Sequence, residues 1–244
     1  MPRFFAARED ILEDKIFIRR EDAYHIARAL RMAVGDSVTV SDGRGEEYLC
    51  TLSSIRDELC ECKIDSHRPS DSEPPVSITL FMAYPKGDKL ELVIQKAVEL
   101  GAARIVPFES SRCIKRPKKD KAEKTTARLQ RIADEAAKQC GRAVLPKVFE
   151  CVSYKEMLGM ASEAELPLFC YEAEGDNSIH RVLSSNKSVK EISVTVGCEG
   201  GFSPEEAKEA LEAGLISVSL GRRILRCETA PIFALSAISY EFEL

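Results

Sequence analysis

The chain has 244 residues, of which 44% are hydrophobic and 31% are charged, a balance typical of a soluble globular protein with one large or two modest domains. No apolar run approaches the roughly 18 residues of a membrane span. Charges at Arg8, Glu9 and Asp10 exclude a signal-peptide core, so we expect a cytoplasmic protein that does not associate with membranes. The 9 cysteines and 3 histidines lack zinc-ligand spacing, and we therefore expect neither a metal site nor a disulfide framework.

The first seventy residues have the pattern of a small β domain. Residues alternate with period two in 15–19, 36–42 and 59–65, which predicts strands. The turn DGRG at 42–45 separates the second of these from EEYLCTLSSI, as in a hairpin. Residues 21–32 form the predicted helix, with Ile26, Ala29 and Leu30 on its apolar stripe. Several short strands and one helix predict a β-barrel-like domain over 1–70.

The polar segment HRPSDSEPP ends in a predicted linker, 71–75, and a second domain is predicted over 76–244. Strands and helices alternate there, which predicts an α/β domain with a mostly parallel sheet. The expected strands are 76–83, 103–109, 166–172, 191–197 and 215–220, and the expected helices are 86–101, 121–140, 203–214 and 229–243. Ser203, Pro204 and Glu206 predict an N-cap, a first-turn proline and a capping box.

Charge is distributed unevenly along the chain. The whole sequence has a net charge of −5, and residues 1–75 alone carry 11 Lys and Arg against 16 Asp and Glu. Residues 112–147 carry 12 Lys and Arg against 4 Asp and Glu. This basic segment, 112–147, fits contact with a polyanion, and it also fits a solvated, lysine-rich helix face.

Two loops near the C-terminal end carry the strongest chemical pattern. GCEGGFSPEE (197–206) places glycines after a strand and before a helix, an arrangement that often binds phosphate. Its spacing matches neither common phosphate motif, and Glu199 would repel a pyrophosphate. A carboxylate suits a ligand with hydroxyls or a positive centre, such as S-adenosylmethionine; a strained turn with a helix-capping Glu is the alternative. The second loop is LGRRILRCETAP (220–231).

Together these loops resemble the paired signature of SPOUT (trefoil-knot) methyltransferases, and most closely the ribosomal RNA small subunit methyltransferase E family. KGDKLELVIQKAVELGAARIVPFESSRC, QCGRAVLPKV and HIARALRMAVGD also resemble elements of that family, so the likeness covers essentially the whole chain. One departure is Cys198, where the family usually has Pro. The likeness implies a SPOUT-type α/β trefoil-knot domain preceded by a PUA-like RNA-binding β-barrel.

The resemblance further implies an S-adenosylmethionine-dependent enzyme that methylates N3 of a uridine in 16S ribosomal RNA and that acts as a homodimer. Its 16S rRNA partner would be met within the small ribosomal subunit. The implied cofactor-binding residues are Tyr171, Glu172, Gly197, Glu199, Gly200, Gly201, Leu220, Gly221, Ile224, Leu225, Arg226, Thr229 and Ala230.

For catalysis we expect Arg226 to stabilise the uracil anion and Glu228 to be a candidate base. The alternatives are that Arg226 forms an ion pair with Glu228 or Glu199, and that Glu228 satisfies the helix N-terminus. The RNA-binding candidates lie on the first helix, in the basic segment and beside the second loop: His25, Arg28, Arg31, Arg112, Lys115, Arg116, Lys118, Lys119, Lys121, Gln139, Arg142 and Arg222.

Two other functions stay open at this point. The chain could be a SPOUT enzyme that acts on another position of ribosomal or transfer RNA. It could also be an RNA-binding or assembly protein with an inert methyltransferase domain, although the intact glycine-rich and ILRCETA loops argue against this.

Overall fold

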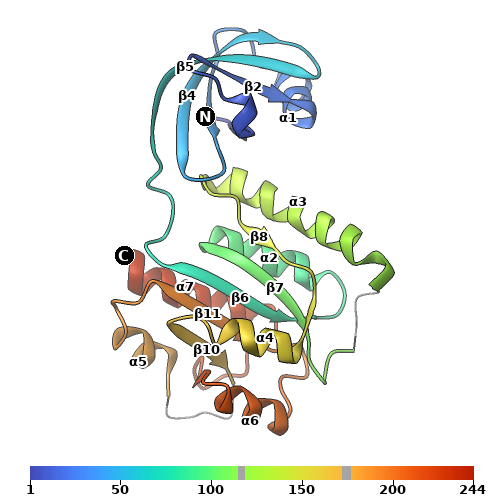
Figure 1. The fold of residues 1–244 in the computed structure, drawn as a ribbon, viewed down its shortest axis with the longest axis vertical. Coiled ribbons are helices and arrows are strands. Elements are labelled where there is room, and N and C mark those ends of the chain that lie inside the picture. Colours follow the sequence, from blue (N-terminus) through green and yellow to red (C-terminus); the bar gives the residue numbers. More distant parts are fainter. Residues whose placement is uncertain (115–118, 172–176) are drawn as a thin grey trace. The chain divides into compact units, whose positions relative to one another are not determined.

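The computed structural model describes residues 1–114, 119–171 and 177–244. The chain divides into two compact units. The first comprises Met1–Glu73 and Ala137–Leu145, and the second comprises Pro74–Ala136 and Pro146–Leu244 (Figure 1). Sequence patterns point to a single separator at 71–75, and nothing in them indicates that 137–145 belongs with the N-terminal residues.

The first unit is a five-stranded sheet in the order β1-β3-β4-β5-β2. Its strands are β1 (Arg3–Phe5), β2 (Lys15–Arg19), β3 (Ser37–Ser41), β4 (Glu46–Ile55) and β5 (Leu59–Pro69). Only β1 and β3 pair in parallel; the other neighbours are antiparallel. Register shifts in the β4–β5 pair bend this long hairpin, and alternate side chains such as Val38 and Val40 enter one core. The expected β domain and its 42–45 hairpin turn are confirmed.

The first helix differs from the prediction. It is α1 (Arg20–Tyr24) continued by a π-helical segment, His25–Ala29. Because a π turn is wider than an α turn, the residues after His25 rotate out of the expected stripe. Ala23 and Ile26 are buried, whereas Leu30 is 42% exposed.

The second unit is a parallel sheet in the order β12-β10-β11-β6-β7-β8, with β9 also paired to β7. Its strands are β6 (Ser77–Ala83), β7 (Ala102–Glu109), β8 (Lys147–Val148), β9 (Val152–Ser153), β10 (Leu166–Cys170), β11 (Glu191–Val196) and β12 (Ile216–Val218). Its helices are α2 (Lys89–Glu99), α4 (Tyr154–Ala161), α5 (Ile179–Ser184), α6 (Pro204–Glu212) and α7 (Thr229–Glu243), together with α3 (Ala122–Cys140) up to Ala136. In Figure 1, α4 lies in front of the sheet and α2 and α7 lie behind it.

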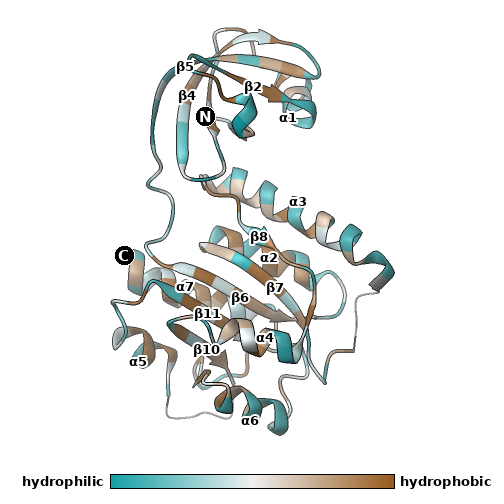
Figure 2. Cartoon of the chain, in the orientation of Figure 1, coloured by the Kyte–Doolittle hydropathy of each residue, from teal (hydrophilic) through white to brown (hydrophobic). Residues whose placement is uncertain are grey.

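Apolar side chains hold these layers together. Figure 2 shows the strands of the sheet as predominantly hydrophobic and α3 and α6 as largely hydrophilic. The predicted stripe of α2 is buried in full, and Gly101 ends the helix with a φ of 87°. The predicted capping box of α6 is also present, with Ser203 and Glu206 exchanging hydrogen bonds. The expected parallel α/β arrangement is therefore confirmed.

Candidate active site

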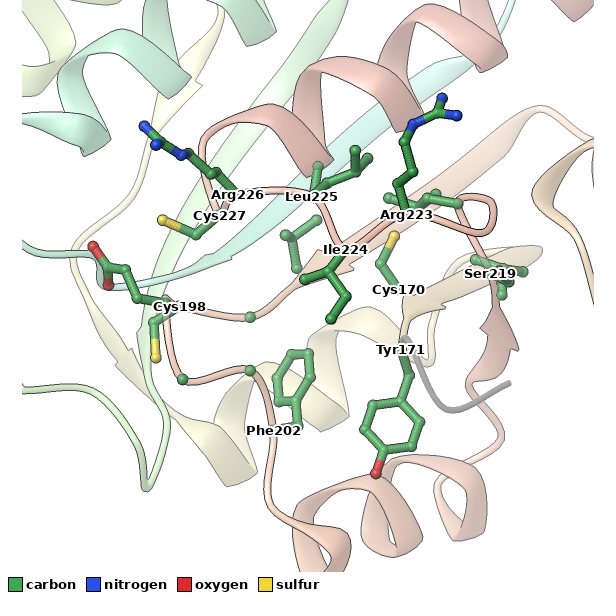
Figure 3. Close-up of a pocket in the computed structure, with 18 of the residues that line it drawn as sticks. Cys170, Tyr171, Cys198, Phe202, Ser219, Arg223, Ile224, Leu225, Arg226 and Cys227 are labelled. Carbon is green, nitrogen blue, oxygen red and sulfur yellow. The ribbon is translucent and has the colours of Figure 1, made fainter. Parts of the chain in front are cut away.

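A cavity of about 430 Å³ opens where three neighbouring strands of the sheet end (Figure 3). The strands β12, β10 and β11 are parallel, so their carboxyl ends meet at one edge. The loops after them build the walls, and ligands of parallel α/β sheets bind at such edges. Of the residues expected to bind the cofactor, the cavity brings together Tyr171, Gly197, Glu199, Gly200, Gly201, Leu220, Gly221, Ile224, Leu225, Arg226 and Ala230.

Two of the residues expected to bind the cofactor remain. Glu172 lies outside the described residues. Thr229 begins α7 and is exposed, but it does not line the cavity.

The loop after β11 folds back on itself, and its glycines permit this. A Cβ atom at Gly197 would lie 3.1 Å from the Cα of Gly201, and one at Gly200 would lie 3.0 Å from the Cβ of Arg112. Gly201 itself has a φ of 63°. The next residue, Phe202, is buried with its ring centroid 4.4 Å from that of Phe169, which anchors the loop to the core. The glycine-rich loop is thus shaped by close backbone approach.

Glu199 connects this loop to the start of α2. Its carboxylate accepts hydrogen bonds from the backbone N–H of Lys86 at 3.1 Å and 3.4 Å and forms an ion pair with Lys89 at 3.1 Å. Lys89 also forms an ion pair with Glu228 at 3.1 Å. This Glu199–Lys89–Glu228 arrangement, the Lys89 bridge, joins α2, the glycine-rich loop and the start of α7.

The Lys89 bridge changes the acidity of its members. The hydrogen bonds that Lys89 donates to Glu199 and Glu228 raise the pKa of Lys89, which stays charged. Burial opposes ionisation of Glu199, but its backbone N–H, Lys89 and Lys86 together lower its pKa. The pKa of Glu228 is lowered chiefly by a hydrogen bond from its own backbone, with Cys227 and Lys89 contributing. Both carboxylates are therefore ionised at neutral pH, and Glu228 is a weak proton acceptor.

Arg226 is at the lip of the cavity and is exposed. Its side chain forms no hydrogen bond or ion pair with any residue in the described part of the chain, and Glu199 and Glu228 both pair with Lys89 instead. The alternative of an ion pair between Arg226 and either carboxylate is therefore not observed. Figure 3 shows Arg226 and Arg223 extending away from the middle of the pocket, where Ile224 lies. Arg222, beside them, is also exposed.

Several lining residues were not anticipated. Lys89 is the most important, because it lies 110 positions before Glu199 and no local spacing connects the two. Cys198, Phe202 and Cys227 also line the cavity. Their positions within the two predicted loops, 197–206 and 220–231, are the signal that could have found them.

The candidates of the basic segment have different environments. Arg112 donates to the backbone oxygen of Gly200 at 2.8 Å, while Gln139 and Lys121 are exposed. Arg142 is 4% exposed and donates to Glu73 at 2.6 Å, so its geometry indicates a structural role and corrects the expected RNA contact. Lys115, Arg116 and Lys118, together with the side chain of Lys119, lie outside the described residues.

In the first unit, Arg28 donates to both oxygens of Asp57, at 2.9 Å and 2.6 Å. His25 and Arg31 are exposed, and Arg31 has a φ of 51°. The charge of Arg28 is thus largely matched within the unit.

Two possible features are absent from the described ranges. No helix there is both long and apolar enough to cross a membrane. No group of three or more His, Cys, Asp or Glu among the same residues could hold a metal ion.

Known proteins and family models match this chain over nearly its whole length. Residues 72–239 match the model of an RNA methyltransferase domain, and residues 18–65 match that of an RNA methyltransferase PUA domain. The ribosomal RNA small subunit methyltransferase E of Bacillus subtilis is 34% identical over 100% of this chain and 98% of its own length.

Solved structures agree as well. The ribosomal RNA small subunit methyltransferase E of Neisseria gonorrhoeae, bound to S-adenosyl methionine, superposes with a TM-score of 0.85 and 31% identity over 98% of this chain and 97% of that one. A putative methyltransferase of Legionella pneumophila in complex with the bound cofactor SAM superposes with a TM-score of 0.87. It is 29% identical over 98% of this chain and 96% of that one. These similarities confirm the expected SPOUT-type trefoil-knot domain with a PUA-like domain before it.

Proposed function

The chain belongs to the ribosomal RNA small subunit methyltransferase E family, and on this premise we propose that it transfers a methyl group from S-adenosylmethionine to N3 of a uridine in 16S ribosomal RNA. The observation that carries the proposal is the single cavity built by the loops after β10, β11 and β12. Relatives along the full chain are small-subunit ribosomal RNA methyltransferases, and similar solved structures contain the cofactor.

The residues of the cavity fit S-adenosylmethionine. Its volume of about 430 Å³ is within the range of small-molecule sites. Leu220, Ile224 and Leu225 offer accessible apolar surface for an adenine ring. The glycine-rich loop offers backbone groups at close approach, and the ionised Glu199 favours a positive ligand over a phosphate. When bound, the cofactor supplies an electrophilic methyl group.

The chain's own residues would prepare the uracil. Loss of the N3 proton spreads negative charge over N3 and two carbonyl oxygens, and an unpaired guanidinium at the cavity lip stabilises that charge. Arg226 is in this position, and its guanidinium has no ion pair with a described residue that would have to break first. Glu228 already forms an ion pair with Lys89, and the pKa of Glu228 is lowered. Both observations favour a structural role for Glu228 over the role of general base. We therefore assign the N3 proton to solvent, with Arg226 favouring its departure.

The assembly and location of the enzyme belong to the same proposal. We infer a cytoplasmic homodimer that acts on RNA within the small ribosomal subunit. On α7, Phe233 is 42% exposed and Tyr240 is 71% exposed, and apolar surface of this kind supports association with a second copy.

The decisive experiment combines cofactor binding with identification of the product. Calorimetry should show that the protein binds S-adenosylmethionine. Small subunits from a methylation-deficient strain, incubated with enzyme and cofactor, should yield 3-methyluridine on nucleoside analysis. A different methylated nucleoside would assign another RNA position, and cofactor binding without any product would favour an assembly protein.

A further inference from the structure

A second cavity lies in the first unit, which contains no part of the active site. Its volume is about 330 Å³, and it is lined by Arg8, Ile11, Asp42, Arg44 and Tyr48. The lining thus combines two guanidinium groups with one aromatic ring. Neither the family models nor the relatives assign a role to this cavity.

The aromatic ring is supported from one side. Tyr48 on β4 pairs directly with His67 on β5, and their rings stack with centroids 5.7 Å apart at 22°. Tyr48 is partly buried against the core of the unit, whereas His67 is exposed. Burial, with Asp42 and Glu46 nearby, raises the pKa of Tyr48, so its hydroxyl stays neutral at pH 7. The ring is therefore a fixed, uncharged platform with a polar tip.

The two guanidinium groups are available to a ligand. Arg8 and Arg44 are exposed, and neither side chain has a hydrogen bond or ion pair with a residue that the structure describes. Some other arginines of the unit are engaged, since Arg3 pairs with Glu47 at 2.5 Å and Arg28 pairs with Asp57.

The acid in the lining belongs to the turn. Asp42 accepts hydrogen bonds from the backbone N–H of Arg44 at 2.8 Å and of Glu46 at 3.0 Å. These bonds hold its carboxylate in the hairpin turn. Two free cations therefore face the ligand space beside one acid that the turn already uses.

We propose that this cavity binds a nucleotide of single-stranded RNA, with the base stacked on Tyr48 and the flanking phosphates held by Arg8 and Arg44. Aromatic stacking beside positive charge is how proteins hold unpaired nucleotides, since every base has a face to stack and every linkage carries a charge. An acidic protein partner would use the arginines but gives no role to the supported ring. The inference rests on the proposed function in that the bound strand is part of the RNA substrate.

This assignment differs from the expectation for the first helix. His25, Arg28 and Arg31 were predicted to contact RNA, yet Arg28 is bound bidentately by Asp57. The cavity beside Tyr48 offers unpaired charge and an aromatic face together.

The test uses the full-length protein and a fluorescein-labelled, single-stranded oligouridylate of about twelve nucleotides, with binding followed by anisotropy. Arg8→Gln with Arg44→Gln should weaken binding about tenfold at low salt and reduce the slope of log affinity against log salt by roughly 1. Tyr48→Phe should bind like the wild type, and Tyr48→Ala should lose about tenfold. The control is Arg56→Gln, at the opposite end of the β4–β5 hairpin, which should have little effect. It removes one charge, so it is compared with the single variants Arg8→Gln and Arg44→Gln, each of which should lose part of the affinity.

Stability and cofactor affinity separate this idea from the proposed function. Thermal melting of each variant excludes unfolding as the cause, and the paired arginine variant is decisive because both side chains are exposed. If that variant binds the oligonucleotide like the wild type, the inference is overturned, whatever the methylation assay shows. If it binds more weakly while calorimetry with S-adenosylmethionine is unchanged, the inference holds, even where no 3-methyluridine forms.

Discussion

At the scale of single residues, Glu199 shows which properties of the glycine-rich loop the sequence predicts and which it does not. A carboxylate at position 199 indicates a ligand without phosphate, and the ionised state of Glu199 supports this. The sequence could not reveal that the same carboxylate already binds the Lys86 N–H and the Lys89 ammonium. Those partners are more than a hundred positions away, so only the fold brings them together.

Arg226 has the most direct prediction at this scale. Arg226→Ala should lower kcat by about a hundredfold or more, because one preorganised charge at a developing anion has an effect of that size. Affinity for S-adenosylmethionine should change by less than about threefold, since the guanidinium extends away from the middle of the pocket (Figure 3). Single-turnover methyl transfer and calorimetry measure the two quantities, with Arg222→Ala as a neighbouring comparison. Normal turnover by Arg226→Ala would remove it from the mechanism.

Glu47 gives a prediction about stability and pH. This buried carboxylate accepts hydrogen bonds from Arg3 at 2.5 Å and Ser70 at 2.8 Å. Burial alone would raise its pKa, but Arg3, Ser70 and Arg68 lower it below its ordinary value of 4.5. A lowered pKa stabilises the fold above pH 4.5, and this stabilisation is lost as the pH falls through the folded-state value.

Glu47→Gln should therefore reduce the free energy of unfolding by about 2 kcal/mol at pH 7, and by progressively less at acidic pH as the pH falls below 4.5 through the folded-state pKa. Urea denaturation followed by circular dichroism at neutral and at acidic pH measures this. Glu61→Gln is the control, because its 3.4 Å pair with Lys15 is well exposed and should contribute little. An equal loss at both pH values would show that charge is not the cause.

At the scale of elements, local rules succeed where local interactions dominate. The apolar period of α2 and the capping box of α6 depend on residues three and four apart, and both are present as predicted. The helix after Arg19 differs because a π-helical segment changes its period, which no propensity indicates. The short strands β8 and β9 were missed, since two residues carry no periodicity and their pairing with β7 defines them.

The Lys89 bridge leads to a prediction about the three elements that it connects: α2, the glycine-rich loop and the start of α7. Lys89→Met removes the ammonium group between Glu199 and Glu228 and leaves two carboxylates facing each other. The glycine-rich loop and the start of α7 then lose their shared attachment to α2, so affinity for S-adenosylmethionine should fall about tenfold, or roughly 1.4 kcal/mol. Lys89→Arg should recover part of this loss.

Calorimetry measures the affinity of the Lys89 variants. The control is Lys96→Met on the same helix, where the lysine pairs only with Glu99 at 2.8 Å. If Lys89→Met binds the cofactor as tightly as Lys96→Met does, the bridge has no part in shaping the site.

At the scale of the whole molecule, the sequence indicates two units but does not indicate which residues belong to each. Residues 137–145 join the first unit through contacts such as the 2.7 Å hydrogen bond from Ser41 Oγ to the Ala143 oxygen and the bonds from the Ala143 and Val144 N–H to Glu73. These partners are about 70 to 100 positions apart in sequence. Composition and periodicity describe neighbours along the chain, so they cannot predict that a later segment packs in the first unit.

Charge is the other property of the whole chain, and it can be tested with salt. The protein has a net charge of −5, yet the basic segment carries 12 positive against 4 negative side chains. RNA should bind there through its phosphates and release counterions. The affinity should fall steeply as the salt concentration rises, because releasing counterions into concentrated salt is less favourable. Lys121, exposed just before α3, is suited to a test of this kind.

Lys121→Glu should weaken RNA binding at least fivefold at 50 mM salt and much less at 300 mM, because the change acts through screened charge. Anisotropy with labelled small-subunit RNA across this salt range measures the difference. Lys155→Glu makes the same change in net charge at an exposed position of α4, outside the basic segment, and should have a smaller effect. Since both variants alter the total charge equally, a larger loss at Lys121 would locate the RNA on the basic segment. Equal losses at both salt concentrations would instead indicate that Lys121 supports the fold.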